Sequence, residues 1–126
     1  MGTTRCGQIW SWKMGEQINF MNKIDLQDIP AKELVPGFHG KFIHTENMTI
    51  VWWDVETGAL LPEHAHMHEQ VSHLTEGEFE MTVDGETQLL KPGSAVVIPS
   101  NARHSGKAVT NCRIIDVFCP VREDYR

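Results

Sequence analysis

Hydrophobic and polar residues alternate over short stretches along most of the chain, and no stretch has a sustained period of 3.6 residues. In the clearest alternation, Phe79, Met81 and Val83 take one side of the backbone while charged and hydroxyl side chains take the other. Residues 48–55 are rich in β-branched and aromatic side chains, which predicts a buried strand. These patterns are typical of β-structure.

Turn signals separate these stretches at short intervals. Asp84-Gly85 is a two-residue hairpin signal, and Pro92-Gly93 and Pro99 mark further breaks. Besides the two stretches above, we expect strands at 18–22, 41–44, 60–66, 70–75, 87–90, 95–98, 104–108 and 112–119. Many short strands with frequent turns indicate an all-β sandwich or barrel, a class that includes jelly rolls.

The length of 126 residues favours a single domain, which we place at residues 18–126. Residues 1–17 are expected to form an N-terminal tail, or an arm that docks through Trp10 and Trp12. The net charge of −6 argues against nucleic acid and anionic membrane surfaces as partners. No apolar run approaches the roughly 20 residues of a membrane span.

Three cysteines without a close-set pair favour a reducing compartment over a disulfide framework. We therefore expect a soluble, cytoplasmic protein. Cys112 and Cys119 lie in an apolar run and are expected to fill the core.

Four of the seven histidines lie between residues 58 and 77. His64 and His66 are two residues apart, so on an extended strand both imidazoles leave the same face. His104, far along the chain, follows the turn at Pro99 and could join them. Imidazole suits the mid-row divalent metals, so the pattern predicts a metal site. The alternative is a histidine-rich surface tract that binds metal adventitiously.

The spacing of these residues resembles the two motifs of the cupins. The first motif matches at Gly58, His64, His66, Gln70 and Gly77, with Gln70 where most cupins have glutamate. The second matches at Gly93, Pro99, Asn101 and His104. The resemblance implies a β-jelly-roll barrel with one metal ion in its mouth, and it implies four ligands: His64, His66, Gln70 and His104.

Two neighbours compete with Gln70 for the metal. Glu69 would be a ligand if the gap after His66 were one residue shorter, and His68 is the other candidate. Strand parity favours Gln70, because Glu69 would start on the opposite face. Four neutral ligands would leave the charge of the ion uncancelled, which favours an anionic ligand. The metal could be nickel, zinc, manganese or iron.

Residues 64–71, 77–80 and 120–125 resemble the KdgF type of cupin, which acts in pectin and alginate degradation, and the match extends over roughly residues 18–126. The resemblance implies ring opening and ketonisation of 4,5-unsaturated monouronates to linear 5-keto-4-deoxyuronates. The substrate would be a small anionic sugar. The alternatives are a cupin dioxygenase and a non-enzymatic metal- or sugar-binding module. We expect a homodimer.

The last strand supplies further candidates. Asp116 shares a face with Ile114 and Phe118, so its carboxylate is expected among apolar side chains. The resemblance supports Asp116 as a general acid/base; the alternative is an ion pair with Arg103 or Arg113.

Two more residues belong to the same predicted site. Arg122 follows Pro120 and is a candidate catalytic residue and bidentate clamp for a substrate carboxylate, or else an exposed arginine at the rim. Phe118 could offer a ring face to the sugar, or belong to the core. His39, His44 and His73 fit no functional pattern.

Overall fold

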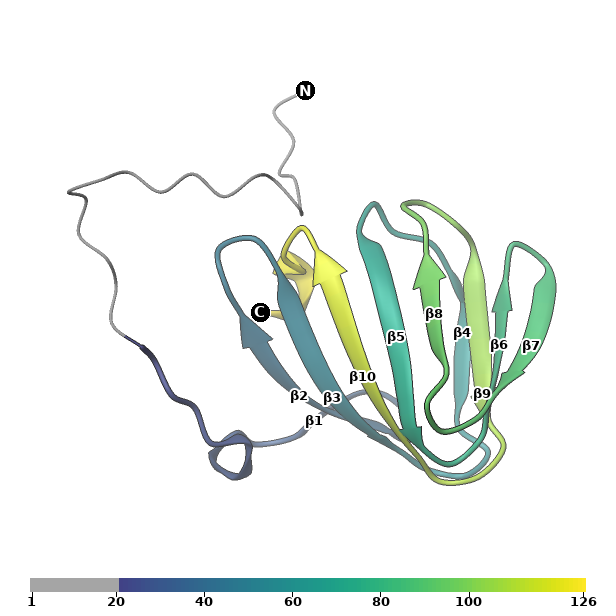
Figure 1. Ribbon diagram of the computed structural model, residues 1–126, viewed down its shortest axis with the longest axis horizontal. Coiled ribbons are helices and arrows are strands. Elements are labelled where there is room, and N and C mark those ends of the chain that lie inside the picture. Colours follow the sequence, from purple (N-terminus) through teal and green to yellow (C-terminus); the bar gives the residue numbers. More distant parts are fainter. Residues whose placement is uncertain (1–20) are drawn as a thin grey trace.

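The structure is a computed structural model that describes residues 21–126 (Figure 1). Met21 and Asn22 belong to no strand, so the strand expected at 18–22 is wrong for these two residues. The rest of that prediction, and the tail or arm at 1–17, lie outside the described residues. None of the described helices is long and apolar enough to cross a membrane.

Two antiparallel sheets face each other (Figure 1). The larger sheet has the order β1-β2-β3-β10-β5-β8 and the smaller one β4-β9-β6-β7. The strands are β1 Lys32–Val35, β2 Phe38–His44, β3 Thr49–Val55, β4 Leu60–His64, β5 Glu69–Glu76, β6 Phe79–Val83, β7 Glu86–Leu90, β8 Ala95–Ile98, β9 His104–Ala108 and β10 Cys112–Cys119. Two short 3-10 helices flank them, η1 Leu26–Asp28 and η2 Glu123–Tyr125. The predicted all-β jelly roll is confirmed.

The core lies between the sheets because each strand turns its alternate apolar residues inward. Strand β10 shows this most clearly, since Ile114, Asp116 and Phe118 are all buried and Arg113 is exposed. The largest fully buried apolar side chains come from both sheets: Val51, Leu74, Phe79 and Ile98.

Gly106 on β9 leaves room for the ring of Phe79 on the neighbouring strand β6 of the same sheet. A Cβ atom at this position would lie 2.2 Å from Cε1 of Phe79, so any larger residue would displace the ring. The glycine therefore has a packing reason, which differs from the turn glycines with positive φ such as Gly58 and Gly77.

Three local expectations need correction. Strand β1 was not expected, because its four residues are mostly exposed and lie between Pro30 and Pro36. Strand β4 ends at His64, so His66 lies in the following loop rather than on the strand. Cys112 is a buried free thiol, as expected, whereas Cys119 is half-buried, so the core-filling role fits Cys112 alone.

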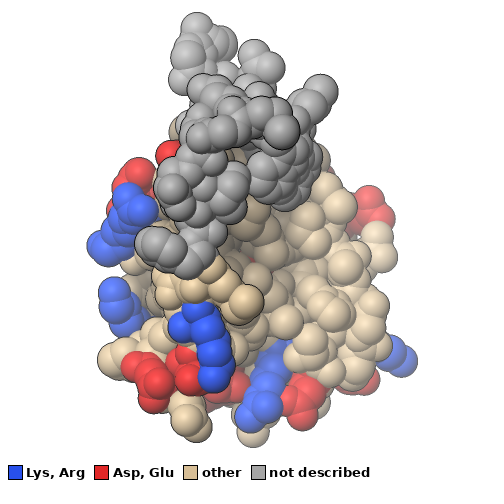
Figure 2. All heavy atoms as spheres, turned by 60° about the vertical axis from the view of Figure 1, so that its left-hand side comes forward, with Lys and Arg blue, Asp and Glu red and all other residues tan. Residues whose placement is uncertain are grey.

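Charged residues of both signs intermix on the face seen in Figure 2, and a broad area of that face carries uncharged side chains. The net charge of −6 is therefore not gathered into one acidic patch on this face.

Candidate active site and metal centre

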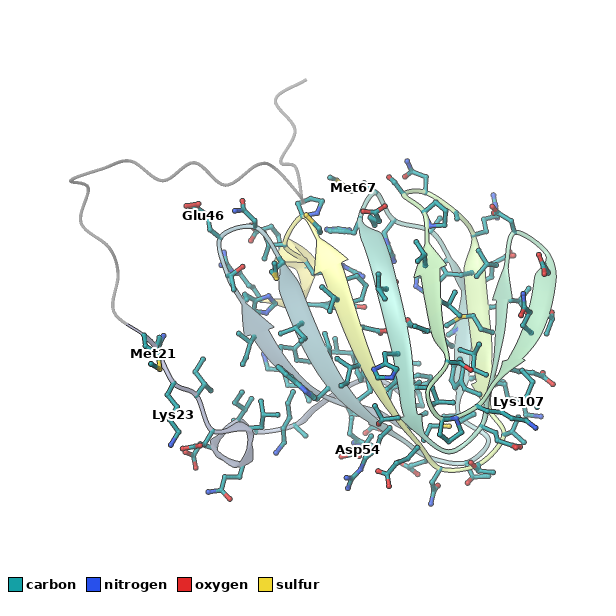
Figure 3. The ribbon with its side chains drawn as sticks, in the orientation of Figure 1. Met21, Lys23, Glu46, Asp54, Met67 and Lys107 are labelled. Carbon is teal, nitrogen blue, oxygen red and sulfur yellow. The ribbon has the colours of Figure 1, made fainter. Side chains whose placement is uncertain are left out.

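Three histidines meet at one end of the barrel. His64 ends β4 and His104 begins β9, and the two residues are paired across the antiparallel ladder. His66 reaches the same point from the β4–β5 loop, whose Met67 lies at the upper end of the sheet in Figure 3, while Asp54 lies at the opposite end. One ligating atom from each histidine lies within 4.8 Å of the others.

The backbone fixes which nitrogen of each ring faces the cluster. In each histidine Nδ1 lies near the carbonyl oxygen of a residue two positions away, at 2.8 Å for His64, 3.0 Å for His66 and 3.0 Å for His104. A carbonyl can only accept, so Nδ1 carries the proton and Nε2 keeps its lone pair. The Nε2 atom of His104 is buried and has no hydrogen-bond partner among residues 21–126.

The surroundings keep two of these imidazoles neutral. Burial above all, together with the positive charge of Arg122 and the neighbouring His104, lowers the pKa of His66 to about 4. Burial also lowers the pKa of His104. Neutral imidazole is the form that binds metal.

Gln70 completes the group from β5. Its side chain is buried and its Oε1 lies 3.1 Å from Nε2 of His66. Both atoms carry lone pairs, and two acceptors at this distance are favourable only with a cation between them. Three imidazole nitrogens and one amide oxygen therefore fit a single divalent ion.

The two competing residues lie elsewhere. Glu69 is exposed on the outer face of β5, as strand parity predicted. His68 turns its Nε2 toward the carbonyl oxygen of Val121, at 3.2 Å, and does not belong to the histidine cluster.

Asp116 is buried beside this cluster. The indole Nε1 of Trp53 donates to its Oδ2 at 2.9 Å, and the Ser72 hydroxyl donates to Oδ1. Burial raises the pKa of Asp116, although the two donors and the charge of Arg122 oppose the rise. A carboxyl group with a raised pKa can both take up and return a proton.

The alternative ion pairs for Asp116 are wrong. Arg103 pairs with Glu63 at 3.6 Å, and Arg113 pairs with Asp54 at 3.0 Å. Both arginines are exposed and lie away from the buried carboxylate.

Arg122 is buried, so it is not an exposed rim residue. Its Nε and Nη2 donate to the two carboxylate oxygens of Asp124, at 2.9 and 2.7 Å. Its guanidinium carbon lies 4.7 Å from the ring centroid of Phe118 and 3.8 Å from that of Tyr125. Nη1 is buried and finds no partner within the described chain, so this nitrogen can still serve a ligand.

One cavity of about 200 Å³ connects these groups. Its apolar wall includes Leu34, Val35, Phe38, Trp53 and Leu61. The remaining lining residues are polar or aromatic: His64, Gln70, Asp116, Phe118, Arg122 and Tyr125. Two members of the candidate metal centre, a buried carboxyl group and an arginine thus line a space suited to a small anionic molecule.

Four residues around this site had not been predicted individually: Trp53, Ser72, Asp124 and Tyr125. Ser72 was visible as a same-face neighbour of Gln70, two residues along the strand. Asp124 and Tyr125 lie inside the stretch 120–125 that carried the family resemblance.

The remaining histidines lie away from the cavity. His44 bonds the Thr49 hydroxyl at 2.8 Å, and His73 is exposed on β5. His39 lies 2.6 Å from Glu56 in an exposed cluster that includes Glu33.

Comparisons with known proteins agree with this geometry. A cupin domain model matches residues 51–118. The pectin degradation protein KdgF of Dickeya dadantii (strain 3937) is 30% identical over 101 residues, which cover 78% of this chain and 92% of that protein. L-ectoine synthase of Thermobifida fusca (strain YX) is 38% identical over 86 residues, covering 67% of this chain and 55% of that enzyme.

The fold is also similar to that of solved cupin structures. KdgF from Halomonas sp. superposes with a TM-score of 0.79 at 28% identity, over 85% of this chain and 100% of that one. An RmlC-like cupin from Shewanella frigidimarina NCIMB 400 superposes with a TM-score of 0.76 at 28% identity, over 89% of this chain and 97% of that one.

The jelly roll and the matched domain define a cupin, and the chain belongs to that family. Within the family it is KdgF-like, so the resemblance found in the sequence is confirmed.

Proposed function

We propose that the protein opens and ketonises a 4,5-unsaturated monouronate to a linear 5-keto-4-deoxyuronate, in a metal-dependent reaction without a redox step. The observation that carries the proposal is the shared cavity, which two of the predicted metal ligands, His64 and Gln70, line together with the buried Asp116 and Arg122. Similarity to a pectin degradation protein over 92% of its length supports a sugar-derived substrate.

The metal would be held by His64, His66, Gln70 and His104. When bound, it would act as a Lewis acid that stabilises negative charge developing on substrate oxygens. All four donors are neutral, so the protein would leave the charge of the ion available to the substrate.

Asp116 would move the proton. In the substrate the ring oxygen is bonded to C5 of the C4–C5 double bond, so breaking its bond to C1 releases an enolate at C5 and leaves an aldehyde at C1. Asp116 takes the proton of the anomeric hydroxyl as this bond breaks, and then returns the proton to C4 as the enolate becomes a ketone. The raised pKa of Asp116 suits both steps.

Arg122 would bind the substrate carboxylate. Its Nε and Nη2 face Asp124, so the ligand would be met by Nη1 at the end of the guanidinium group. Phe118 lines the same cavity and would contact the sugar ring.

A dioxygenase and a non-enzymatic sugar- or metal-binding module remain the alternatives. Neutral ligands stabilise a higher oxidation state of a metal less well than a carboxylate does, which counts against the dioxygenase. The homodimer and the cytoplasmic location stay predictions.

An ultraviolet assay tests the proposal. A lyase-generated unsaturated monouronate should lose the absorbance of its conjugated double bond when the protein is added, without oxygen uptake. Chelator should abolish the loss and added divalent metal should restore it. Oxygen consumption matching substrate loss would favour the dioxygenase, and binding without any loss of absorbance would favour the binding module.

A further inference from the structure

We propose that Ser72 is a positioning residue that sets the orientation of the Gln70 side-chain amide and thereby presents its oxygen to the metal. Gln70 and Ser72 are two residues apart on the inner face of β5, and both are buried. Nε2 of Gln70 donates to the Ser72 hydroxyl oxygen at 3.0 Å, and that hydroxyl donates to Asp116.

The direction of these bonds follows from the chemistry of the groups. An ionised carboxylate can only accept, so the single proton of the Ser72 hydroxyl points to Asp116. Toward Gln70 the hydroxyl can then only accept, and it must be met by the NH₂ group of the amide. The other end of the amide, Oε1, is turned to the histidines and lies 3.1 Å from Nε2 of His66.

Strand pairing holds the chain of bonds in place. Ser72 lies directly opposite Asp116 in the β5–β10 ladder, and the indole of Trp53 holds the second carboxylate oxygen at 2.9 Å. Ser72 is 2% exposed and Gln70 4%, so there is little room for solvent to replace the hydroxyl.

The orientation of an amide ligand must be fixed for its oxygen to reach the metal, whereas that of a carboxylate need not be. Rotation of a glutamine amide by half a turn replaces the ligating oxygen with an NH₂ group, which has no lone pair to offer the ion. Either oxygen of a glutamate can bind. Ser72 should therefore matter for metal affinity only while residue 70 is glutamine.

A double-mutant cycle tests this inference, which rests on the metal centre of the proposed function and not on the uronate reaction. The affinity for Ni²⁺ or Zn²⁺ alone is measured by competition with a chromophoric chelator. Ser72→Ala should weaken binding roughly 10- to 100-fold, the range for residues that orient a metal ligand. In the Gln70→Glu background the same change should alter affinity by less than about threefold.

Two further variants control for packing. Ser94→Ala removes a half-buried hydroxyl outside the site and should leave affinity unchanged. Ser72→Thr keeps a hydroxyl on the β-carbon and should restore most of the affinity lost in Ser72→Ala. Circular dichroism of the metal-free proteins verifies that each variant is folded.

The outcomes separate the inference from the proposed centre. If Gln70→Ala loses metal affinity and Ser72→Ala does not, the inference about Ser72 is overturned while the metal centre stands. The same holds if Ser72→Ala loses equal affinity in the wild type and in Gln70→Glu. If Gln70→Ala binds the metal as tightly as the wild type, Gln70 is not a ligand, and both the four-ligand centre and the inference about Ser72 are overturned.

Discussion

Nε2 of His66 and Oε1 of Gln70 face each other at 3.1 Å, and both atoms offer lone pairs. The Nδ1 proton of His66 is committed to a backbone carbonyl at 3.0 Å, so the ring has no proton for the amide oxygen. Two lone pairs this close repel each other unless both atoms bind a cation. The buried Nε2 of His104 also has a lone pair without a hydrogen-bond partner among the described residues, and the same cation would satisfy it. This relationship links the fold to the proposed chemistry.

Removal of one imidazole tests the metal centre. His104→Ala should lower the affinity for a divalent metal by at least about 100-fold, because one of the three clustered imidazole ligands is lost. His73→Ala is the matched control, since His73 is exposed on the outer face of β5. Isothermal titration with Zn²⁺ measures both. Equal affinities in the two variants would refute the predicted ligand set.

Asp116→Asn should keep the metal and lose turnover. An amide cannot exchange a proton, so we expect kcat to fall roughly 10²- to 10⁴-fold, the range for general acid/base groups. Metal content is measured on the same sample. Unchanged turnover would remove Asp116 from the mechanism.

Arg122→Lys tests the carboxylate clamp. The planar guanidinium group of Arg122 bonds Asp124 through two nitrogens and keeps a third nitrogen for the ligand. The single ammonium group of lysine cannot do both. Loss of a charged hydrogen bond predicts a KM raised roughly 10- to 100-fold, with a smaller change in kcat. The exposed Arg126, paired with Glu123 at 3.3 Å, provides the control Arg126→Lys. A raised KM in both variants, or in neither, would contradict a specific role for Arg122.

Stability of the metal-free protein should fall on mild acidification. The pKa of His66 is about 4 in the folded chain, below its ordinary value of 6.5. Between these values the unfolded chain binds a proton at this residue and the folded chain does not, so the free energy of unfolding decreases as pH falls. The lowered pKa of His104 acts in the same direction.

Urea unfolding between pH 7 and pH 4 measures the effect. His66→Asn should flatten the pH dependence relative to the wild-type chain, because one of the groups that takes up a proton on unfolding has been removed. Identical slopes for the two proteins would show that His66 does not titrate below its ordinary value.

Gly106→Ala should destabilise the fold without touching the metal. The added Cβ would lie 2.2 Å from a ring carbon of Phe79 and 3.0 Å from the carbonyl oxygen of Glu80. Overpacking of this kind costs about 1–3 kcal/mol. Chemical denaturation of the metal-free protein gives the value, with Ser105→Ala on the same strand as control. A change below about 0.5 kcal/mol in Gly106→Ala would contradict the packing role.

Much of the fold could be predicted because alternation determines which side of a strand faces the core. Residues 112–119 were predicted with their observed bounds, and strand parity correctly placed Gln70 and Glu69 on opposite faces of β5. Strand β1 was not predicted, because Lys32–Val35 has no alternation of apolar and polar residues that would point one side to the core, and it pairs only with β2 at the edge of the sheet.

The convergence of His64, His66 and His104 could be predicted from the sequence, whereas the contacts that hold Asp116 and Arg122 could not. Trp53 is 63 residues from Asp116 in sequence, and its bond to the carboxylate depends on how β3 pairs with β10. The pairing of Arg122 with Asp124 depends on η2, which folds the chain end back beneath the guanidinium group. Neither contact leaves a periodic signal in the sequence.

The most direct measurement is anomalous diffraction from crystals of the protein loaded with one equivalent of Zn²⁺. The account predicts a single strong peak within bonding distance of four atoms, Nε2 of His64, His66 and His104 and Oε1 of Gln70. A peak at the exposed cluster of Glu33, His39 and Glu56, with none between the three buried or half-buried imidazoles, would contradict it.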